Sequence, residues 1–237
     1  MNDVQTVIAI NQLQFQWQIN SPRVLDIDDL QIHRGEKVFI RGASGSGKST
    51  LLSLIAGVMV PQHGEIRVLG HSLPSLKSTR RDAFRASHIG FIFQMFNLLP
   101  YLSVLDNVTL PLHFSAQRRQ RVRNADEEAK RLLSHLDLAG ANILQRPVTE
   151  LSVGQQQRVA AARALIGSPE LVIADEPTSA LDTDRREAFI KLLIRECDQA
   201  GNTLLFVSHD ASLEHYFDHG VDLDSINQSN HSTQAVN

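Results

Sequence analysis

GASGSGKS, residues 42–49, fits the pattern G-x-x-x-x-G-K-[ST] of a phosphate-binding loop. It lies between the β-rich run KVFIRG (37–42) and the run KSTLLSLIAG (48–57), whose spacing predicts a helix closed by a glycine. A strand, this loop and a helix, in that order, are the context in which the pattern forms a site. Gly45 and Gly47 allow backbone N–H groups to converge on phosphate oxygens, and the following helix directs its positive dipole end to the same place.

The side chains of the loop predict a nucleoside triphosphate bound with Mg²⁺. Lys48 would contact the β- and γ-phosphates, Ser49 would offer its hydroxyl to Mg²⁺, and Thr50 would hydrogen-bond the phosphates nearby. The alternative is a glycine-rich loop with a lone lysine. The residues of this loop that we expect to bind the nucleotide are Gly42, Ser44, Gly45, Ser46, Gly47, Lys48, Ser49 and Thr50.

Two adjacent acids follow a second apolar run in LVIADE (171–176). A buried strand delivers carboxylates in this way to the end of a sheet. Asp175 would hold the hydration shell of Mg²⁺, and Glu176 would orient and polarise the attacking water as general base. Taken alone, the run could also be a strand that ends in surface acids.

Composition excludes several protein classes. The 237 residues carry 23 basic and 26 acidic side chains, a net charge of −3, which disfavours general nucleic-acid binding. The single Cys197 excludes an internal disulfide framework and a multi-cysteine metal cluster. The longest apolar run, LLSLIAGVMV (51–60), is far shorter than the roughly 20 residues of a spanning helix, and MNDVQTVIAI (1–10) lacks signal-peptide features. We therefore expect a cytoplasmic protein that needs a partner to work at a membrane.

Hydrophobic patterning predicts a strand-rich start and a β–α–β end. Short strands are expected at TVIAI, LQFQW, VLDI and LQI in the first 40 residues, and at 64–70 and 88–94. LVIAD (171–175), a helix over 186–201 and TLLFVSH (203–209) predict a parallel sheet covered by helices. The tail QSNHSTQAVN (228–237) is poor in apolar residues, and we expect it to be disordered.

The middle of the chain predicts an amphipathic helix that Asn124 caps and that stops at Gly140. The arginine-rich run RRQRVR (118–123) precedes it and could meet lipid headgroups or an acidic partner, but we expect a solvated helix face. The apolar stripe of the helix comprises Ala125, Ala129, Leu132, Leu133 and Leu136.

LSVGQQQRVAAARAL (151–165) narrows the choice among P-loop proteins. Ser152 and Gln155 form an S-x-x-Q capping box, which predicts a second helix N-terminus able to receive an anion. The segment resembles the LSGGQ signature of the ATP-binding cassette (ABC) family and departs from it at Val153. ADEPTSALD (174–182) is equally typical of that family.

The resemblance covers residues 4–225 and implies both fold and assembly. The fold would be α/β: a P-loop NTPase core with a mainly parallel sheet and flanking helices, an N-terminal antiparallel β subdomain and an inserted α-helical subdomain. The core would span 1–94 and 169–225, and the helical signature subdomain would span 95–168. Two cassettes would stack head to tail in an isologous dimer around two ATP molecules. The signature residues that each cassette would place over its partner's ATP are Ser152, Gly154 and Gln155.

Further family elements fall in order along the chain. Gln94 resembles the glutamine that senses Mg²⁺ and the attacking water, with a solvated loop amide as the alternative. SALD (179–182) resembles the D-loop of the dimer seam, and its Asp182 joins the nucleotide-binding candidates. His209 resembles the histidine that contacts the γ-phosphate. Trp17 resembles the aromatic residue that stacks on adenine, with Phe15 on the same strand face as a rival.

The family also implies a membrane partner. Residues 95–112 are apolar for an exposed region and would form the groove that receives a permease, with packing between helices as the alternative. The sequences of several segments resemble those of the subfamily that serves lipoprotein release and macrolide export. We therefore expect a peripheral ATPase on the cytoplasmic face of the inner membrane, bound to a separate permease and to no nucleic acid.

Two rival classes remain open. A soluble cassette that acts on nucleic acid or ribosomes would carry coiled-coil insertions or two cassettes in one chain, and no heptad run interrupts this core. A P-loop kinase that phosphorylates a small substrate would leave LSVGQ unexplained.

Overall fold

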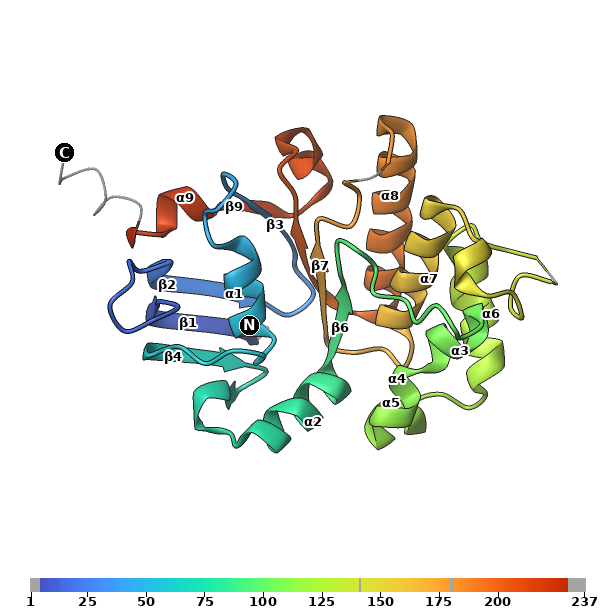
Figure 1. Cartoon of the computed structure of the whole chain (residues 1–237), viewed down its shortest axis with the longest axis horizontal. Coiled ribbons are helices and arrows are strands. Elements are labelled where there is room, and N and C mark those ends of the chain that lie inside the picture. The colour runs from blue at the N-terminus through green and yellow to red at the C-terminus, as the bar shows by residue number, and fades with distance from the viewer. Residues whose placement is uncertain (1–4, 141, 180, 230–237) are drawn as a thin grey trace. The chain divides into compact units, whose positions relative to one another are not determined.

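The computed structural model describes residues 5–140, 142–179 and 181–229, and these fall into two compact units. The first unit comprises the chain up to residue 82 and from residue 206 onward, and the second comprises residues 83–205. The chain passes between the units within helix α2 (Ser78–His88) and within strand β8 (Thr203–Val207) (Figure 1).

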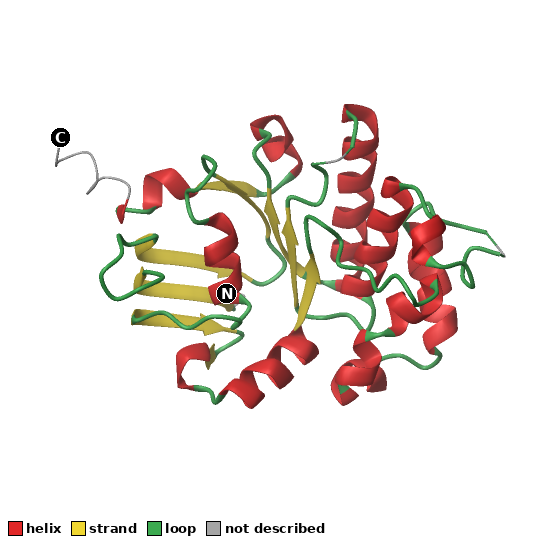
Figure 2. Cartoon of the chain, viewed as in Figure 1, coloured by secondary structure: helices red, strands yellow, loops and turns green. Residues whose placement is uncertain are grey.

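An antiparallel sheet in the first unit confirms the expected N-terminal β subdomain (Figure 2). The prediction of four short strands is wrong, because they merge in pairs into two long ones. β1 stays continuous through a bulge at which Gln12 has a left-handed φ of 48°. The partner strand approaches closely there, since a Cβ on Gly64 would lie 2.2 Å from the Gln12 carbonyl oxygen. The strands, in sheet order, are β2 (Leu25–His33), β1 (Thr6–Phe15), β4 (His63–Val68) and β5 (His71–Ser72).

A parallel strand pair in the first unit carries the phosphate loop. β3 (Lys37–Arg41) pairs with β9 (His219–Asp222), so both strands end at the same edge. Helix α1 (Lys48–Ile55) follows β3 and, as predicted, is closed by Gly57 with a left-handed φ of 67°. Three stacked or tilted phenylalanine rings form part of the core of this unit, namely Phe39, Phe206 and Phe217. The unit also contains η1 (Leu73–Ser75), η3 (Ala211–Tyr216) and α9 (Leu223–Ile226).

The second unit combines a parallel strand pair with a group of helices. β6 (Ile89–Ile92) pairs in parallel with β7 (Leu171–Asp175). Helix α7 contacts β6 and three other helices, and Gly90 permits this packing because a Cβ there would lie 2.2 Å from the Ala164 carbonyl oxygen. The helices are α3 (Val104–Thr109), α4 (Pro111–Phe114), α5 (Ala116–Gln120), α6 (Ala125–His135), η2 (Val148–Glu150), α7 (Val153–Leu165) and α8 (Thr183–Ala200). Within the ranges that the structure describes, no helix has the length and hydropathy of a membrane span.

Helix α6 confirms its predicted cap but not its predicted end. The Asn124 side chain accepts hydrogen bonds from the backbone N–H groups of Asp126 and Glu127. The helix ends at His135 rather than at Gly140, because Asp137 takes a left-handed φ of 60° and the Leu138 N–H bonds to the Leu133 carbonyl. This six-to-one bond, together with the buried Leu138, is a Schellman motif that uses Asp in place of the usual glycine.

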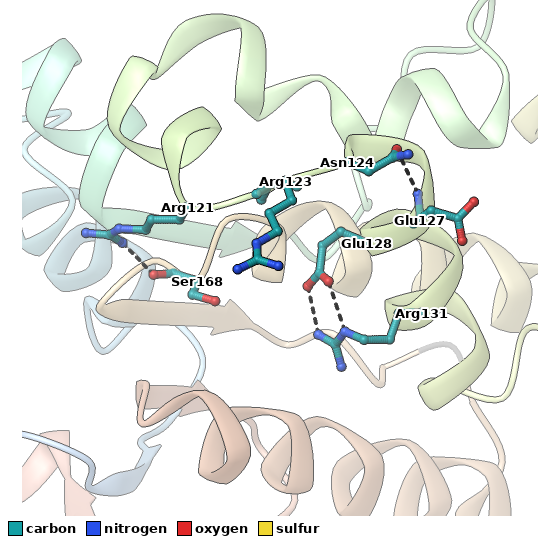
Figure 3. A pocket seen from close by; sticks show the side chains of 8 residues that line it. Arg121, Arg123, Asn124, Glu127, Glu128, Arg131 and Ser168 are labelled. Carbon is teal, nitrogen blue, oxygen red and sulfur yellow. Dashed lines mark hydrogen bonds and ion pairs between the residues drawn. The ribbon is translucent and has the colours of Figure 1, made fainter.

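The arginine-rich run is the expected solvated face only in part, because Arg119, Arg121 and Arg123 are exposed but Arg118 is buried. Arg118 is 2% exposed and donates hydrogen bonds to the carbonyl oxygens of Ala164 and Ile166 at the end of α7. Burial, with a smaller contribution from Arg121, lowers the pKa of Arg118 to about 10. Arg121 reaches the Ser168 carbonyl, as Figure 3 shows. Two of the four arginines in this run, Arg118 and Arg121, therefore donate hydrogen bonds to the backbone at and just after the end of α7.

The first two residues of the expected disordered tail are ordered. The Gln228 N–H donates to the Asp26 carbonyl and the Ser229 hydroxyl donates to the Val24 carbonyl, so both residues are held against β2. The rest of the predicted disordered tail, residues 230–237, lies outside the described residues.

Candidate functional site

The phosphate loop of the first unit has the backbone geometry of an anion site. Gly45 and Gly47 take left-handed φ angles of 81° and 98°. Gly47 is the N-cap of α1, so the N–H groups of the first helical turn, which an α-helix does not pair internally, follow it directly. Among the described atoms none lies within 4 Å of where a Gly45 Cβ would be, whereas a Gly47 Cβ would lie 2.7 Å from the Leu25 side chain. The loop therefore packs on one side and is open on the other.

Lys48 is clamped to the loop rather than extended into solvent. It is 6% exposed, and its Nζ donates to the carbonyl oxygens of Gly42 and Ala43 at 2.8 Å each. The same Nζ lies 3.4 Å from Nδ1 of His209. His209 is placed there because the preceding Ser208 N–H donates to the Ile40 carbonyl of β3. The structure thus brings together two candidates that lie far apart in the sequence.

The serine and threonine side chains of the loop divide into exposed and buried ones. Ser44 and Ser49 are exposed, and Thr50 is buried. Ser46 is 5% exposed, and within the described part of the chain its Oγ finds no hydrogen-bond partner. Because a buried unpaired hydroxyl costs about 1–3 kcal/mol, this atom fits a loop that closes around a polar ligand.

Trp17 and Phe15 have separate environments. Phe15 is 6% exposed at the end of β1, whereas Trp17 lies beyond the strand and is 62% exposed. Their rings meet edge to face with centroids 5.3 Å apart. Phe15 therefore belongs to the core, and Trp17 is the ring with a face available for stacking.

The acidic candidates lie in the second unit, both at the carboxyl end of β7. β7 ends at Asp175, and Glu176 follows with a left-handed φ of 46°, which is uncommon for a residue with a side chain. Ile92 at the end of β6 pairs with Ala174, so the turn that carries the exposed Gln94 leaves the sheet at the same edge. The strand was expected to end at Gln94, but it ends at Ile92, so Gln94 lies two residues beyond the observed strand end.

The predicted capping box opens helix α7. The Ser152 Oγ accepts from the Gln155 N–H at 3.4 Å, and the Gln155 Oε1 accepts from the Ser152 N–H at 3.0 Å. Val153 is the first helical residue and points outward with 48% exposure, so it fits without distorting the helix start. Gly154 has only ordinary contacts around the position of a Cβ.

Two further residues of α7 connect it to the candidate loops, and we did not predict them. Gln157 is 1% exposed and donates to the Pro177 carbonyl at 2.9 Å, directly after Glu176. Arg163 is 9% exposed and donates to the carbonyls of Phe96 and Asn97, just after Gln94. Burial lowers the pKa of Arg163. Neither residue stands out in the sequence, because α7 also carries Gln155, Gln156 and Arg158.

Asp182 is the N-cap of α8. Its Oδ1 accepts from the Arg185 N–H at 3.0 Å, and its other oxygen pairs with the Arg185 Nε at 3.3 Å. Ala180, in the predicted D-loop, lies outside the described residues. The structure therefore gives Asp182 a local structural role at the surface of its unit.

Residues 95–112 combine exposed and buried apolar side chains. Met95 and Tyr101 are 82% and 79% exposed, whereas Val104, Val108 and Leu112 are buried. Part of the segment therefore packs between helices, and part of it presents apolar side chains to solvent.

Comparison with known proteins identifies the family. The family described as ABC transporter matches residues 25–179. The macrolide export ATP-binding/permease protein MacB of Rhodopirellula baltica is 42% identical over 81% of this chain, which spans 28% of that longer relative. The lipoprotein-releasing system ATP-binding protein LolD of Porphyromonas gingivalis is 39% identical over 81% of this chain and 86% of its own length.

Solved structures agree with the sequence relatives. The dimeric, post-hydrolysis structure of the ATP-binding cassette MJ0796, bound to ADP and phosphate, superposes with a TM-score of 0.80. It is 31% identical and covers 94% of this chain and 95% of its own. The expected P-loop NTPase fold is thereby confirmed. The chain belongs to the ABC transporter family, as one of its ATPase cassettes.

Proposed function

We propose that this protein binds and hydrolyses Mg-ATP as a pair of cassettes and thereby drives a separate membrane permease. The observation that carries the proposal is the presence of two anion-receiving helix starts in one chain. One is the phosphate loop before α1, and the other is the capping box that opens α7. Each chain would bind one nucleotide on its phosphate loop. The capping box then also receives a ligand only if it lies over the nucleotide of a partner chain.

The phosphate loop supplies the binding part of this function. The left-handed glycines and the buried Ser46 hydroxyl suit a polyphosphate, and Lys48 would exchange its two carbonyl partners for phosphate oxygens. Ser49, Gln94 and Asp175 are oxygen donors of the kind that Mg²⁺ prefers. When bound, the metal would neutralise charge on the phosphates.

Three side chains are assigned to hydrolysis. Glu176 would take the proton of the attacking water as general base, and Gln94 would orient that water. His209, beside Lys48, would hydrogen-bond the γ-phosphate oxygens. Trp17 would stack on the adenine through its exposed face.

Pairing completes each site. Ser152, Gly154 and Gln155 would cover the nucleotide on the partner's phosphate loop, and Asp182 would lie along the seam between the chains. The MJ0796 relative, whose structure is described as dimeric, supports this arrangement. Because the two surfaces are exchanged symmetrically, the assembly closes as a two-fold dimer.

The partner and the location follow from the same family. The LolD and MacB relatives are named for lipoprotein release and for macrolide export, so we propose a permease of that type. The exposed Met95 and Tyr101 offer apolar contacts to it. The cassette would then sit peripherally on the cytoplasmic face of the inner membrane.

Glu176→Gln tests the proposal. The variant should keep ATP binding, lose hydrolysis and accumulate as an ATP-dependent dimer on gel filtration. Glu187→Gln, on the surface of α8, is the control and should hydrolyse ATP at the rate of the unsubstituted protein. Hydrolysis by Glu176→Gln at the unsubstituted rate would remove Glu176 from its role.

A further inference from the structure

The chain that follows β9 lies against the phosphate loop. We propose that residues 222–227 form a brace that holds this loop in its anion-binding conformation, with Asp224 and Asn227 as positioning residues for ATP. The inference rests on the proposed function, because it concerns affinity at the same loop. It adds residues from a part of the sequence to which no motif pointed.

Strand pairing explains why the brace and the loop meet. Arg41 and Asp222 are register partners at the ends of β3 and β9, and their side chains form an ion pair at 3.3 Å. The chain leaves both strands at this edge, so Gly42 and Leu223 emerge side by side. A Cβ on Gly42 would lie 3.3 Å from the Leu223 Cβ. Glycine at position 42 therefore lets the brace approach the loop.

Asp224 holds the first peptide unit of the loop. Its Oδ2 accepts a hydrogen bond from the Ala43 N–H at 2.6 Å. The carbonyl of the same peptide unit belongs to Gly42 and accepts from the Lys48 Nζ. Since a peptide unit is planar, fixing its N–H also fixes the direction of its carbonyl. Asp224 thus controls where Lys48 is anchored through this shared peptide unit.

Asn227 holds a second peptide unit in the same way. It is fully buried, and its Nδ2 donates to the carbonyls of Ser46 at 3.2 Å and Val24 at 2.9 Å. Its Oδ1 accepts from the Asp26 N–H at 2.8 Å, which fixes the amide. The Ser46 carbonyl shares its plane with the Gly47 N–H, one of the donors that a phosphate would use. The brace therefore orients both the lysine anchor and a phosphate-binding N–H.

Calorimetric titration of the full chain with Mg-ATP tests the brace, together with KM and kcat for hydrolysis. Asp224→Ala loses a charge-assisted hydrogen bond, so we expect ATP to bind about tenfold more weakly. KM should rise in parallel while kcat at saturating ATP stays within about twofold. Asp224→Asn keeps an oxygen that can accept from the Ala43 N–H and should restore binding.

Asp218→Ala is the matched control, because the Asp218 Oδ2 accepts from the Lys37 N–H at 2.8 Å at the opposite end of β3. It removes the same kind of bond away from the loop and should bind ATP like the unsubstituted protein. Asp224→Ala with unchanged affinity, Asp224→Asn as weak as Asp224→Ala, or equal losses in Asp218→Ala would each overturn the brace. An unsubstituted chain that binds no ATP would instead overturn the proposed function, and the brace with it.

Discussion

Glu170→Gln tests how the residue before β7 is held to His88, at the end of α2, and to Arg121. The Glu170 carboxylate accepts a hydrogen bond from His88 Nδ1 at 3.1 Å and another from Arg121 Nη2. Burial alone would raise its pKa, but the hydrogen bonds from His88 and Arg121 outweigh burial and lower the pKa from 4.5 to about 2. This shift corresponds to about 3 kcal/mol, which we reduce to about 2 kcal/mol because solvent screens a partly exposed group.

The sign of the pH dependence follows from the lowered pKa. The stabilisation is fully present above the unfolded pKa of about 4.5 and is lost as the pH falls from there through about 2. Urea unfolding at pH 7 should therefore show Glu170→Gln about 2 kcal/mol less stable than the unsubstituted chain. The difference in unfolding free energy between Glu170→Gln and the unsubstituted chain should become smaller when urea unfolding is repeated at lower pH.

A surface pair provides the control. Glu127 is 67% exposed and pairs with Lys130 at 2.9 Å, so Glu127→Gln should leave the free energy of unfolding nearly unchanged. Two results would refute the stabilising role of the bonds from His88 and Arg121 to Glu170. One is an equal loss of stability in Glu170→Gln and Glu127→Gln at pH 7. The other is a stability difference between Glu170→Gln and the unsubstituted chain that does not change with pH.

Two further substitutions test the packing of α7 and the adenine contact. Gly90→Ala should destabilise the protein by about 1–3 kcal/mol in urea unfolding, because its Cβ would meet the Ala164 carbonyl. Gly140→Ala should be close to neutral, because the nearest described atom outside its chain neighbours would lie 3.8 Å from the new Cβ. Equal stability of these two variants would contradict the close approach. Trp17→Ala should weaken ATP binding several-fold, Trp17→Tyr should retain it, and Ile19→Ala, at the 90% exposed Ile19, should bind ATP like the unsubstituted chain. ATP binding unaffected by Trp17→Ala would remove the stacking role.

Local features could be predicted from the sequence because their partners lie within a few residues. The capping box of Ser152 and Gln155, the Asn124 cap and the left-handed Gly57 each depend on one turn of chain. The phosphate loop was predictable for the same reason. The end of α6 was mispredicted because Asp137 and the buried Leu138 together replaced the glycine that usually closes a helix.

Long-range features could not be predicted in this way. Arg118 is buried by carbonyls more than 40 residues further along the chain, so its charge pattern alone suggested a solvated face. Arg163 and Asp224 likewise act on backbone groups of distant loops, which no periodicity reveals. These contacts depend on strand pairing and helix packing, and only the three-dimensional structure contains them.

A mixing experiment tests whether each nucleotide is shared between two chains. Lys48→Ala disables the phosphate loop, Ser152→Ala disables the capping box, and each variant alone should have little ATPase activity. Head-to-tail pairing predicts that a mixture of the two regains activity, because each mixed dimer contains one site with an intact loop and an intact capping box. A mixture that stays inactive, while both variants still fold and dimerise, would contradict the shared site.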